Sequence, residues 1–306
     1  MAVPTSPDPP HKLLWAGVYQ QLIRHALPDS RFNYDFLKFT PDFRGSEDAV
    51  KRVVELQCYK DAKTVLVTSD NSCEGLRHRA LKDGKRIVIG TCRLRRGFVV
   101  LDPKCIVESR LELAATLDGM EKPGIGRRLD LAQLRDEGVD IDMCALGGLV
   151  FNEQGVVVWE GSALFEVQWA LLQDLKVLSA TVPVVAVAHD CQVVDEAQYR
   201  LDRIKADKNG EVQCDFVVTP ERVLEIKGAA KPSGGVDFNK VDPDALNNIP
   251  PLQELKGIRM MEQIMSSGGF DAKEVKEVKE EEHKAPSAEE QMGIDIVERL
   301  MKGLKS

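Results

Sequence analysis

Residues 64–89 read TVLVTSDNSCEGLRHRALKDGKRIVI, and this stretch decides the fold class. Its two ends, Thr64–Thr68 and Arg86–Ile89, are rich in Val, Ile and Leu, and Glu74–Lys82 between them has the pattern of a helix. Strands that are apolar on both sides are typical of a parallel sheet with helices on both faces. The stretch therefore predicts a βαβ unit in an α/β protein.

The rest of the chain continues this alternation. Further strands are predicted over Phe98–Leu101, Ile141–Val150, Gly155–Trp159, Val182–Ala188 and Val212–Thr219, the last strand of the chain. Further helices are predicted over His11–Leu27, Ser46–Cys58, Leu129–Glu137 and Ser162–Leu178. The pattern indicates one α/β body with a mainly parallel sheet.

Composition excludes several classes of protein. The 306 residues are 43% hydrophobic and 29% charged, which rules out a disordered or collagen-like chain. The formal net charge of -8 argues against an electrostatic nucleic-acid binder. None of the seven cysteines forms a C-x-x-C pair, which favours reduced thiols, and no apolar stretch is long enough to cross a bilayer. We expect a cytoplasmic protein with no membrane or nucleic-acid partner.

The sequence predicts three segments. Residues 1–10 carry four prolines and form a flexible leader, and residues 11–268 form the α/β body. Residues 269–306 begin as a run of Lys, Glu and Val and end in a short amphipathic helix. This tail is a solvated linker, or residues 270–306 dock on the body or on a protein partner.

Three polar segments carry the residue types that chemistry needs. They are Thr40–Gly45, Gly155–Glu166 and His189–Asp195. The second runs from a predicted strand through a turn into the start of a helix, and the third follows a buried strand. Ligands of open parallel sheets bind beyond the carboxyl ends of strands. His189 is a ligand contact or the cap of the next turn, and the polar residues after it bind a ligand or hold the loop together. Arg77, Lys85, Arg93, Arg95 and Arg96 form either a basic cluster for anions or a solvated face.

The ordered set of motifs resembles the 5-formyltetrahydrofolate cyclo-ligase (methenyltetrahydrofolate synthetase) family, especially its methenyltetrahydrofolate synthetase domain-containing branch. The likeness spans roughly residues 11–256. The stretches that carry it are TPDFRGS at 40–46, LKDGK at 81–85, TCRL at 91–94, HDCQVVD at 189–195, DFVVTP at 215–220 and IPPL at 249–252.

This resemblance implies a three-layer α/β/α sandwich of the NagB/RpiA/CoA-transferase-like type with a mainly parallel sheet. It also implies ATP- and Mg²⁺-dependent conversion of 5-formyltetrahydrofolate to 5,10-methenyltetrahydrofolate, with a reduced folate or related small molecule as ligand. The residues that it assigns are Gly155, Gly161 and Arg93 to the cofactor, His189, Asp190, Gln192, Asp195 and Arg44 to the substrate, and Glu166 to the metal.

The phosphate loop departs from the family pattern, which reads roughly G-x-R-I-G-K-G-E-G-Y-A-D-L-E. Here residues 155–168 read GVVVWEGSALFEVQ, so that Val157 replaces the Arg and Glu160 replaces the Lys. Trp159 and Ala163 replace two of the glycines, and Glu166 takes the position of the Asp. Two hypotheses follow: a cyclo-ligase-type enzyme, or a non-catalytic member that binds folate or nucleotide or acts as a protein-interaction module.

Overall fold

The computed structural model describes residues 9–29, 35–36, 39–161, 163–207 and 210–266. The chain divides into two compact units, Met1–Ile258 and Arg259–Ser306. The leader predicted for residues 1–10, apart from residues 9 and 10, and the whole predicted tail at 269–306 lie outside the described residues.

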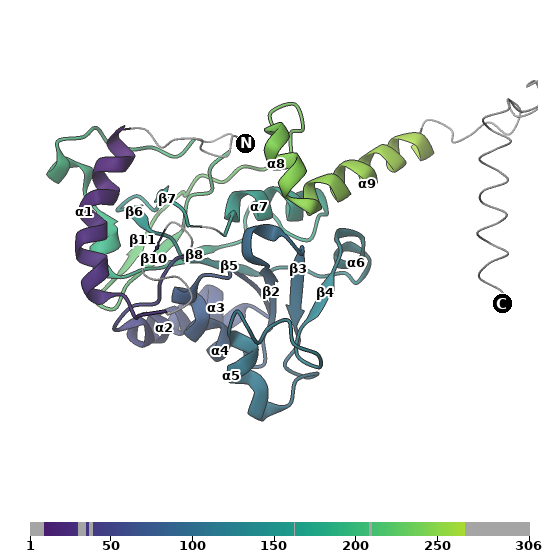
Figure 1. The fold of residues 1–306 in the computed structure, drawn as a ribbon, viewed down its shortest axis with the longest axis horizontal. Coiled ribbons are helices and arrows are strands. Elements are labelled where there is room, and N and C mark those ends of the chain that lie inside the picture. The colour runs from purple at the N-terminus through teal and green to yellow at the C-terminus, as the bar shows by residue number, and fades with distance from the viewer. Residues whose placement is uncertain (1–8, 30–34, 37–38, 162, 208–209, 267–306) are drawn as a thin grey trace, which may run out of the picture. The chain divides into compact units, whose positions relative to one another are not determined.

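Within the described residues, eight strands form one sheet (Figure 1). In chain order they are β1 (Thr64–Val67), β2 (Arg86–Gly90), β3 (Phe98–Leu101), β4 (Arg127–Leu129), β5 (Met143–Leu146), β8 (Val184–Val187), β10 (Phe216–Val218) and β11 (Val223–Glu225). Their order across the sheet is β11-β10-β8-β5-β1-β2-β3-β4. The run β10-β8-β5-β1-β2 is parallel, whereas β11, β3 and β4 pair antiparallel. The prediction of a mainly parallel sheet is confirmed.

Helices pack on both faces of this sheet (Figure 1). In chain order they are α1 (Pro9–His25), α2 (Ser46–Glu55), α3 (Gln57–Asp61), α4 (Glu74–Lys82), α5 (Leu111–Ala115), α6 (Leu131–Asp136), α7 (Phe165–Asp174), α8 (Pro243–Asn248) and α9 (Pro250–Ser266). A smaller sheet has the order β7-β6-β9, from β6 (Val150–Asn152), β7 (Val157–Trp159) and β9 (Val193–Val194).

The alternation of side chains along each strand separates two cores. In β1, Val65 and Val67 pack with α2, α3, α4 and α5, while Leu66 between them packs with α6 and α7. Because successive side chains of a strand point to opposite faces, an apolar run is buried on both sides only between two helical layers. The largest fully buried side chain is Trp169 of α7, whose Nε1 donates to the carbonyl oxygen of Pro232 at 3.0 Å. The layers predicted from the apolar runs are present.

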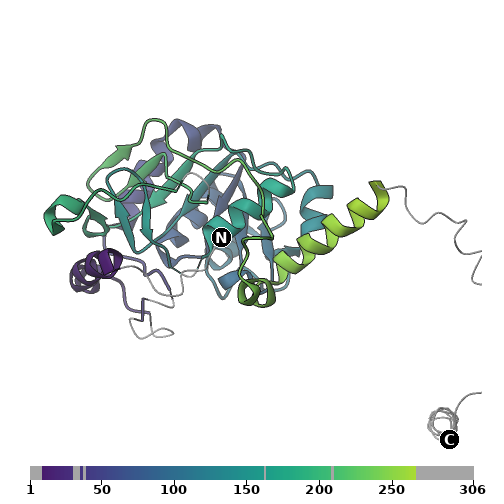
Figure 2. The same cartoon turned by 90° about the horizontal axis from the view of Figure 1, so that it is seen from above.

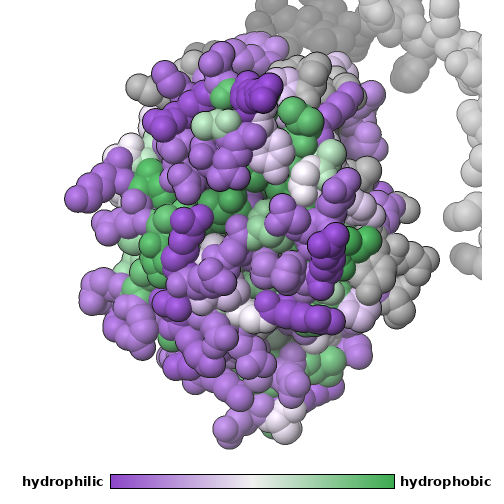
Figure 3. Space-filling model, turned by 90° about the vertical axis from the view of Figure 1, so that its left-hand side faces the viewer, coloured by the Kyte–Doolittle hydropathy of each residue, from purple (hydrophilic) through white to green (hydrophobic). Residues whose placement is uncertain are grey.

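A third core lies between α1 and the small sheet (Figures 1 and 2). Leu14, Val18 and Leu22 of α1 are buried there. Figure 3 looks at the side that carries α1 and shows apolar patches interrupted by hydrophilic side chains. Exposed Leu13 and Ile23 of the same helix add apolar surface, as isolated residues do on most proteins.

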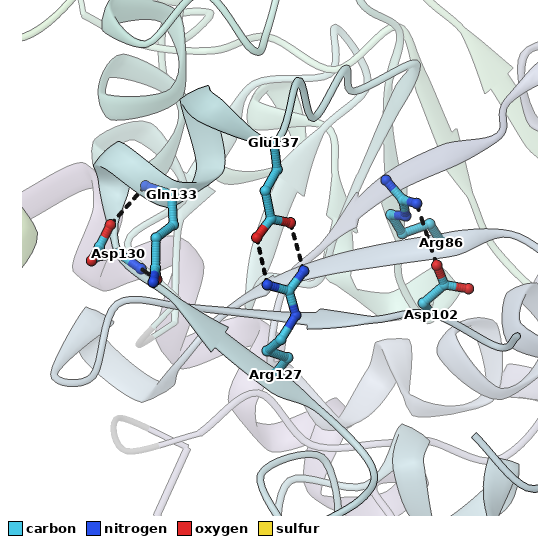
Figure 4. Close-up of polar contacts among 6 residues, drawn as sticks. All are labelled: Arg86, Asp102, Arg127, Asp130, Gln133 and Glu137. Atoms are coloured by element: carbon cyan, nitrogen blue, oxygen red, sulfur yellow. Dashed lines mark hydrogen bonds and ion pairs between the residues drawn. The ribbon is translucent and has the colours of Figure 1, made fainter. Parts of the chain in front are cut away.

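Near the antiparallel edge, the helix predicted over Leu129–Glu137 begins later than expected. Arg127 starts β4, and α6 follows only after Asp130 (Figure 4). The Asp130 side chain accepts from the N–H of Gln133 at 2.7 Å, and the Gln133 side chain accepts from the N–H of Asp130 at 3.0 Å. This capping box fixes the start of the helix. Arg127 also forms a two-bonded ion pair with Glu137, which contributes less than about 1 kcal/mol because it is exposed.

Several other predicted elements have different bounds. The strand expected over Ile141–Val150 is divided between β5 in the large sheet and β6 in the small one. The helix expected over Ser46–Cys58 is broken at Leu56, whose extended backbone separates α2 from α3. The helix expected over Ser162–Leu178 is shorter as α7, and Lys176 beyond its end has a positive φ of 59°. Val212–Thr219 is not the last strand: only its end forms β10, and β11 returns antiparallel to it after the turn at Pro220. These ends depend on local backbone geometry that periodicity does not encode.

Candidate functional site

The sheet has a switch point between β1 and β5. From β1 the chain crosses to β2 on one side, and later returns to place β5 on the other side. The carboxyl ends of these parallel strands therefore diverge into loops that leave in opposite directions, which is the usual ligand position of such sheets. The residues at this edge are Thr68–Asn71 after β1 and the pair Gly147 and Gly148 after β5.

The turn after β1 is tightly held. Asp70 is buried, and its Oδ2 accepts from Thr68 Oγ1 at 2.5 Å and from the N–H of Gly147 at 3.2 Å. Below it, Nη1 of the fully buried Arg77 donates to the carbonyl oxygens of Thr68 at 2.7 Å and Asp70 at 2.9 Å. Arg77 Nε donates to the carbonyl oxygen of Ala115 at 2.7 Å. The turn is therefore rigid before any ligand arrives.

Buried oxygen atoms without a partner gather at this edge. Within the described part of the chain, Thr40 Oγ1, Asn71 Oδ1, Ser72 Oγ and Gln168 Oε1 are buried here and have no hydrogen-bond partner. Two further buried atoms lack a partner, Gln154 Oε1 in the β6–β7 turn and Arg77 Nη2 under the turn after β1. The N–H of Asn71 donates to the carbonyl oxygen of Thr40 at 3.1 Å, which joins the segment before α2 to the turn after β1. Buried polar groups are nearly always paired, so a cluster of unpaired ones marks a place where a ligand or water completes the bonding.

Glu160 lies where the loop after β7 meets the N-terminus of α7. Its Oε1 accepts from the N–H of Phe165, the first residue of the helix. Burial raises the pKa of Glu160 to about 8, with smaller contributions from the charges of Glu166 and Asp70. Burial also raises the pKa of Glu166 to about 7, and Glu211 adds to this shift. The N-terminus of α7 thus carries acids rather than cations.

Gly161 brings this loop against the turn after β1. A Cβ atom at Gly161 would lie 2.3 Å from Thr40 Oγ1 and 3.6 Å from Asp70 Oδ1. Real Cβ atoms do not approach that closely, so only glycine permits this contact. The predicted importance of Gly161 therefore has a packing explanation that needs no cofactor.

The segment after β8 adds a second polar group at the same edge. Gln192 is buried, and its Nε2 donates to the carbonyl oxygen of Gly148 at 2.7 Å while its Oε1 accepts from the N–H of His189 at 2.7 Å. The Nδ1 of His189 accepts from the N–H of Cys191 at 3.1 Å. Gln192 therefore fastens this loop to the end of β5.

His189 also joins the loop to α1. Its ring stacks on that of His25 with centroids 4.1 Å apart and meets the edge of Phe43 at 5.6 Å. Burial and the neighbouring His25 lower the pKa of His189, which favours its neutral form. Asp190 Oδ1 accepts from Thr219 Oγ1 at 2.5 Å, which ties the loop to the end of β10. His189 is thus both a cap and an aromatic contact.

The structure brings some of the predicted site residues together and separates others. Gly161 lies in the loop after β7 and Glu166 in the first turn of α7, while His189, Asp190 and Gln192 follow β8. Asp195 caps the turn that follows by accepting from the N–H of Ala197 at 3.0 Å. Gly155 turns the β6–β7 hairpin with φ 77°. Arg93, in the loop after β2, and Arg44, next to Phe43, are exposed. Their roles stay predictions.

Arg77 and Lys85 do not join the basic cluster suggested by the sequence, whereas Arg93, Arg95 and Arg96 are all exposed. Arg77 is buried under the turn after β1, and Lys85 Nζ donates to the carbonyl oxygen of Ala62 at 2.6 Å. Arg96 pairs with Glu121 at 2.5 Å. Their closeness in sequence suggested one cluster, but in the fold each of these side chains contacts a different partner.

The centre of the site lies at residues that the sequence motifs did not indicate. Asp70, Asn71 and Ser72 belong to the polar run TSDNS that directly follows the apolar strand TVLV, and Gly147 follows Met143–Leu146. A polar run at the carboxyl end of a buried strand is the signal that was available. It did not indicate which other loops meet there.

One prediction concerns Gln192. Replacing it by Ala leaves the carbonyl oxygen of Gly148 and the N–H of His189 buried without their partner, so we expect a loss of about 2 kcal/mol in the free energy of unfolding. Gln198→Ala, on an exposed position of the same segment, is the matched control and should change little. Urea denaturation measures both, and equal losses would contradict the role given to Gln192.

Similarity to known proteins agrees with the motifs. A model of the 5-formyltetrahydrofolate cyclo-ligase family matches residues 18–198, which is more than half of the chain. The chain belongs to this family. The resemblance inferred from the ordered motifs is thereby confirmed, and it links the chain to folate chemistry.

The relatives are distant and longer. The methenyltetrahydrofolate synthase domain-containing protein of Mus musculus is 26% identical over 250 residues, which cover 78% of this chain and 64% of the relative. The protein of the same name from Danio rerio is 25% identical over 218 residues, which cover 71% of this chain and 54% of the relative. The chain thus spans just over half to nearly two thirds of the length of these relatives.

Two solved structures are also similar. The NMR structure of Aquifex aeolicus 5,10-methenyltetrahydrofolate synthetase has a TM-score of 0.41 and 17% identity, and covers 71% of this chain and 93% of its own. The structure of the Mycoplasma pneumoniae 5,10-methenyltetrahydrofolate synthetase has a TM-score of 0.37 and 15% identity. The match covers 69% of this chain and 98% of the other chain.

The described residues do not fit a magnesium triphosphate at the N-terminus of α7. Such a ligand needs unused backbone N–H groups and nearby cations, but the N–H of Phe165 already bonds Glu160. In the described part of the chain, no group of three or more His, Cys, Asp or Glu residues is arranged to hold a metal ion. Glu166 as a metal ligand stays a prediction. No described helix is both long and apolar enough to cross a membrane.

Proposed function

We propose that this protein binds a reduced folate or a related small molecule at the carboxyl edge of its sheet and does not carry out ATP-dependent ring closure. Membership of the cyclo-ligase family supports the folate class of ligand. The buried unpartnered oxygens of Thr40, Asn71 and Ser72 beside Asp70 support the position. The absence of ATP-dependent ring closure is inferred from one observation: the carboxyl of Glu160 accepts a hydrogen bond from the N–H of Phe165.

Ring closure driven by ATP needs a phosphoryl group on the formyl oxygen, and catalysis of phosphoryl transfer relies on N–H groups and cations around the phosphates. Here the acceptor oxygen of Glu160 uses the first N–H of α7, whether the acid is ionised or protonated. Where it is ionised, two unit charges 4 Å apart at an effective dielectric of 20 repel by about 4 kcal/mol. A repulsion of this size lowers the affinity for a phosphate group by roughly three orders of magnitude.

The test is a binding and turnover assay on one sample. We expect isothermal titration to give a heat for 5-formyltetrahydrofolate, no heat for ATP with Mg²⁺, and no rise in methenyl-folate absorbance when all three are mixed. An active cyclo-ligase run in parallel shows that the assay works. A rise in absorbance would make the protein an ATP-dependent enzyme, and a folded sample that gives no folate heat would refute the binding.

Catalysis is the competing hypothesis, and family membership supports it. The two differ in one measurable quantity, the rate of methenyl-folate formation in the presence of ATP. A role for residues 270–306 in binding a protein partner stays a prediction, because those residues lie outside the described ones.

A further inference from the structure

The exposed side of α1 carries a row of evenly spaced positions. Leu14, Val18 and Leu22 face the third core, whereas Leu13 and Ile23 lie outside it and are 49% and 40% exposed. One exposed Leu or Ile needs no explanation. A row at the spacing of one helix face is different, because it is the pattern by which helices dock on one another.

The exposed residues Leu13, Ala16, Gln20 and Ile23 form such a row, which we call the α1 outer face. They are separated by three, four and three residues, which places them on one side of the helix, opposite Val18. At a helical rise of about 1.5 Å per residue, the row is about 15 Å long. It therefore matches roughly two heptads of a partner helix.

Basic side chains flank the α1 outer face. No Asp or Glu occurs between Pro9 and His25, and Lys12 and Arg24 lie on opposite sides of the row. Arg44 lies beside the end of the helix, because its N–H donates to the carbonyl oxygen of His25 at 2.9 Å. The flanks of the face are therefore positive.

A further basic segment packs on the same helix. The Tyr199 ring lies against Gly17, where a Cβ atom would be 2.5 Å from the Tyr199 hydroxyl oxygen. Residues 200–205, which follow it, hold three bases and one acid. Arg24 and Arg200 form no ion pair within the part of the chain that the structure describes. Positive charge thus gathers around α1, although the whole chain has a formal net charge of -8.

A second copy of this chain is a poor occupant of the α1 outer face. Two α1 helices paired through it would bring the Lys12 and Arg24 side chains of both copies to one seam, and α1 has no acid to neutralise them. Like charges across a helix seam are destabilising. Charge complementarity therefore favours a partner whose flanks are acidic.

A lipid bilayer also fits this face less well than a helix does. Ala16 and Gln20 at its centre are small and polar, so the apolar side chains of Leu13 and Ile23 do not form a continuous strip. Helices that lie in a bilayer surface bury a continuous apolar face. A seam between two helices instead tolerates a polar residue between apolar anchors.

We propose that the α1 outer face binds an acidic amphipathic helix of a partner protein. Apolar side chains of the partner pack on Leu13 and Ile23, and its carboxylates face Lys12 on one flank and Arg24 on the other. The inference goes beyond folate binding and does not depend on it. His25, whose ring stacks on His189 in the loop after β8, lies on the inner side of the helix.

The probes are two fluorescein-labelled peptides, each three heptads long, which differ only in the charge of their flanks. Both have Leu at the a and d positions and Ala at the outer positions, and one has Glu and the other Lys at e and g. Flanks of like charge keep each peptide from pairing with itself. We expect fluorescence anisotropy to show that the full chain binds the acidic peptide at least about tenfold more tightly, and less tightly as salt rises. Equal or tighter binding of the basic peptide, or no binding of the acidic peptide to folded protein, overturns the proposal.

A first pair of variants locates the binding. Ile23→Glu places a charge in the row and should weaken the acidic peptide at least about tenfold, because an apolar contact is lost and like charges meet. Val107→Glu makes the same kind of change at a position outside α1 that is 65% exposed, and should leave the binding unchanged. Equal affinities of the two variants would place the peptide elsewhere and refute the assignment.

A second pair tests the charge and leaves the apolar row intact. Arg24→Glu should weaken the acidic peptide and tighten the basic one, each by about threefold to tenfold. Arg128→Glu reverses an exposed charge on β4 and should change neither affinity. Both positions are exposed, so we expect unchanged melting profiles. If Arg24→Glu binds the two peptides as the unmodified protein does, charge complementarity is not the basis of binding and the proposal is wrong.

Two further measurements address the other occupants. Sedimentation of the full chain tests for a second copy, and flotation with vesicles of phosphatidylcholine and phosphatidylserine tests for a membrane. We expect neither a dimer that Ile23→Glu dissociates nor vesicle binding that Ile23→Glu abolishes. Either result would assign the α1 outer face to that occupant and overturn the proposal, while the folate proposal would stand.

Discussion

Replacing Arg77 by Met should lower the free energy of unfolding by about 3 to 5 kcal/mol, the range for removing one partner of a buried charged network. The guanidinium is fully buried, and it satisfies the carbonyl oxygens of Thr68, Asp70 and Ala115. Met fills a similar volume but donates no hydrogen bond, so three buried acceptors lose their partner. Urea denaturation followed by circular dichroism measures the change.

Arg79→Met is the control, because Arg79 lies on the same helix α4. Its side chain is half exposed and pairs with Asp83 at 3.0 Å, so its removal should cost less than about 1 kcal/mol. Similar losses of unfolding free energy in the two variants would contradict a stabilising role for the buried hydrogen bonds of Arg77. We also expect Arg77→Met to weaken 5-formyltetrahydrofolate under conditions where it remains folded, since it no longer holds the turn at Asp70.

Replacing Glu160 by Gln should stabilise the protein by about 2 to 4 kcal/mol at pH 9 and have little effect near pH 4.5. The pKa of this carboxyl rises from 4.5 to about 8 on folding, because burial disfavours its charge. Between these two values the folded state holds a proton that the unfolded state has released, so the acid destabilises the fold increasingly as pH rises. The penalty is complete above pH 8.

The measurement is the midpoint of urea denaturation at several pH values between 4.5 and 9. Gln keeps the acceptor for the N–H of Phe165, so the cap of α7 remains while the titration disappears. Glu153→Gln, at an exposed position, should keep the pH profile of the unmodified protein. Parallel profiles for Glu160→Gln and the unmodified protein would contradict the burial of the charge.

Local pattern predicted the core elements well and their ends poorly. The helix over Glu74–Lys82 and the strand over Phe98–Leu101 have the predicted bounds, because each is a short apolar or amphipathic run with clear flanks. The helix expected over Leu129–Glu137 begins two residues later, because Leu129 ends β4 and pairs with Phe98 of β3, 31 residues away in sequence. Pairing across a sheet is invisible to periodicity.

The site shows the same division. The sequence drew attention to Glu160 as an acid in the position of a family lysine, and to Gln192 as a polar residue after a strand. It did not show that Glu160 accepts a hydrogen bond from the first N–H of α7. Nor did it show that the Gln192 side chain is bonded to the carbonyl oxygen of Gly148 after β5. Residue type predicts which chemistry is possible, but the direction of a side chain depends on packing.

The sequence by itself determined the α/β class, the mainly parallel sheet and the family, because these follow from local apolar runs and from motifs in a fixed order. Only the tertiary structure decided that β5 lies beside β1, and hence that Thr40, Asp70, Gly147 and Glu160 meet at one edge. The physical reason is that strand order depends on contacts between distant segments, which minimise exposed apolar surface over the whole chain. No short stretch of sequence encodes such contacts.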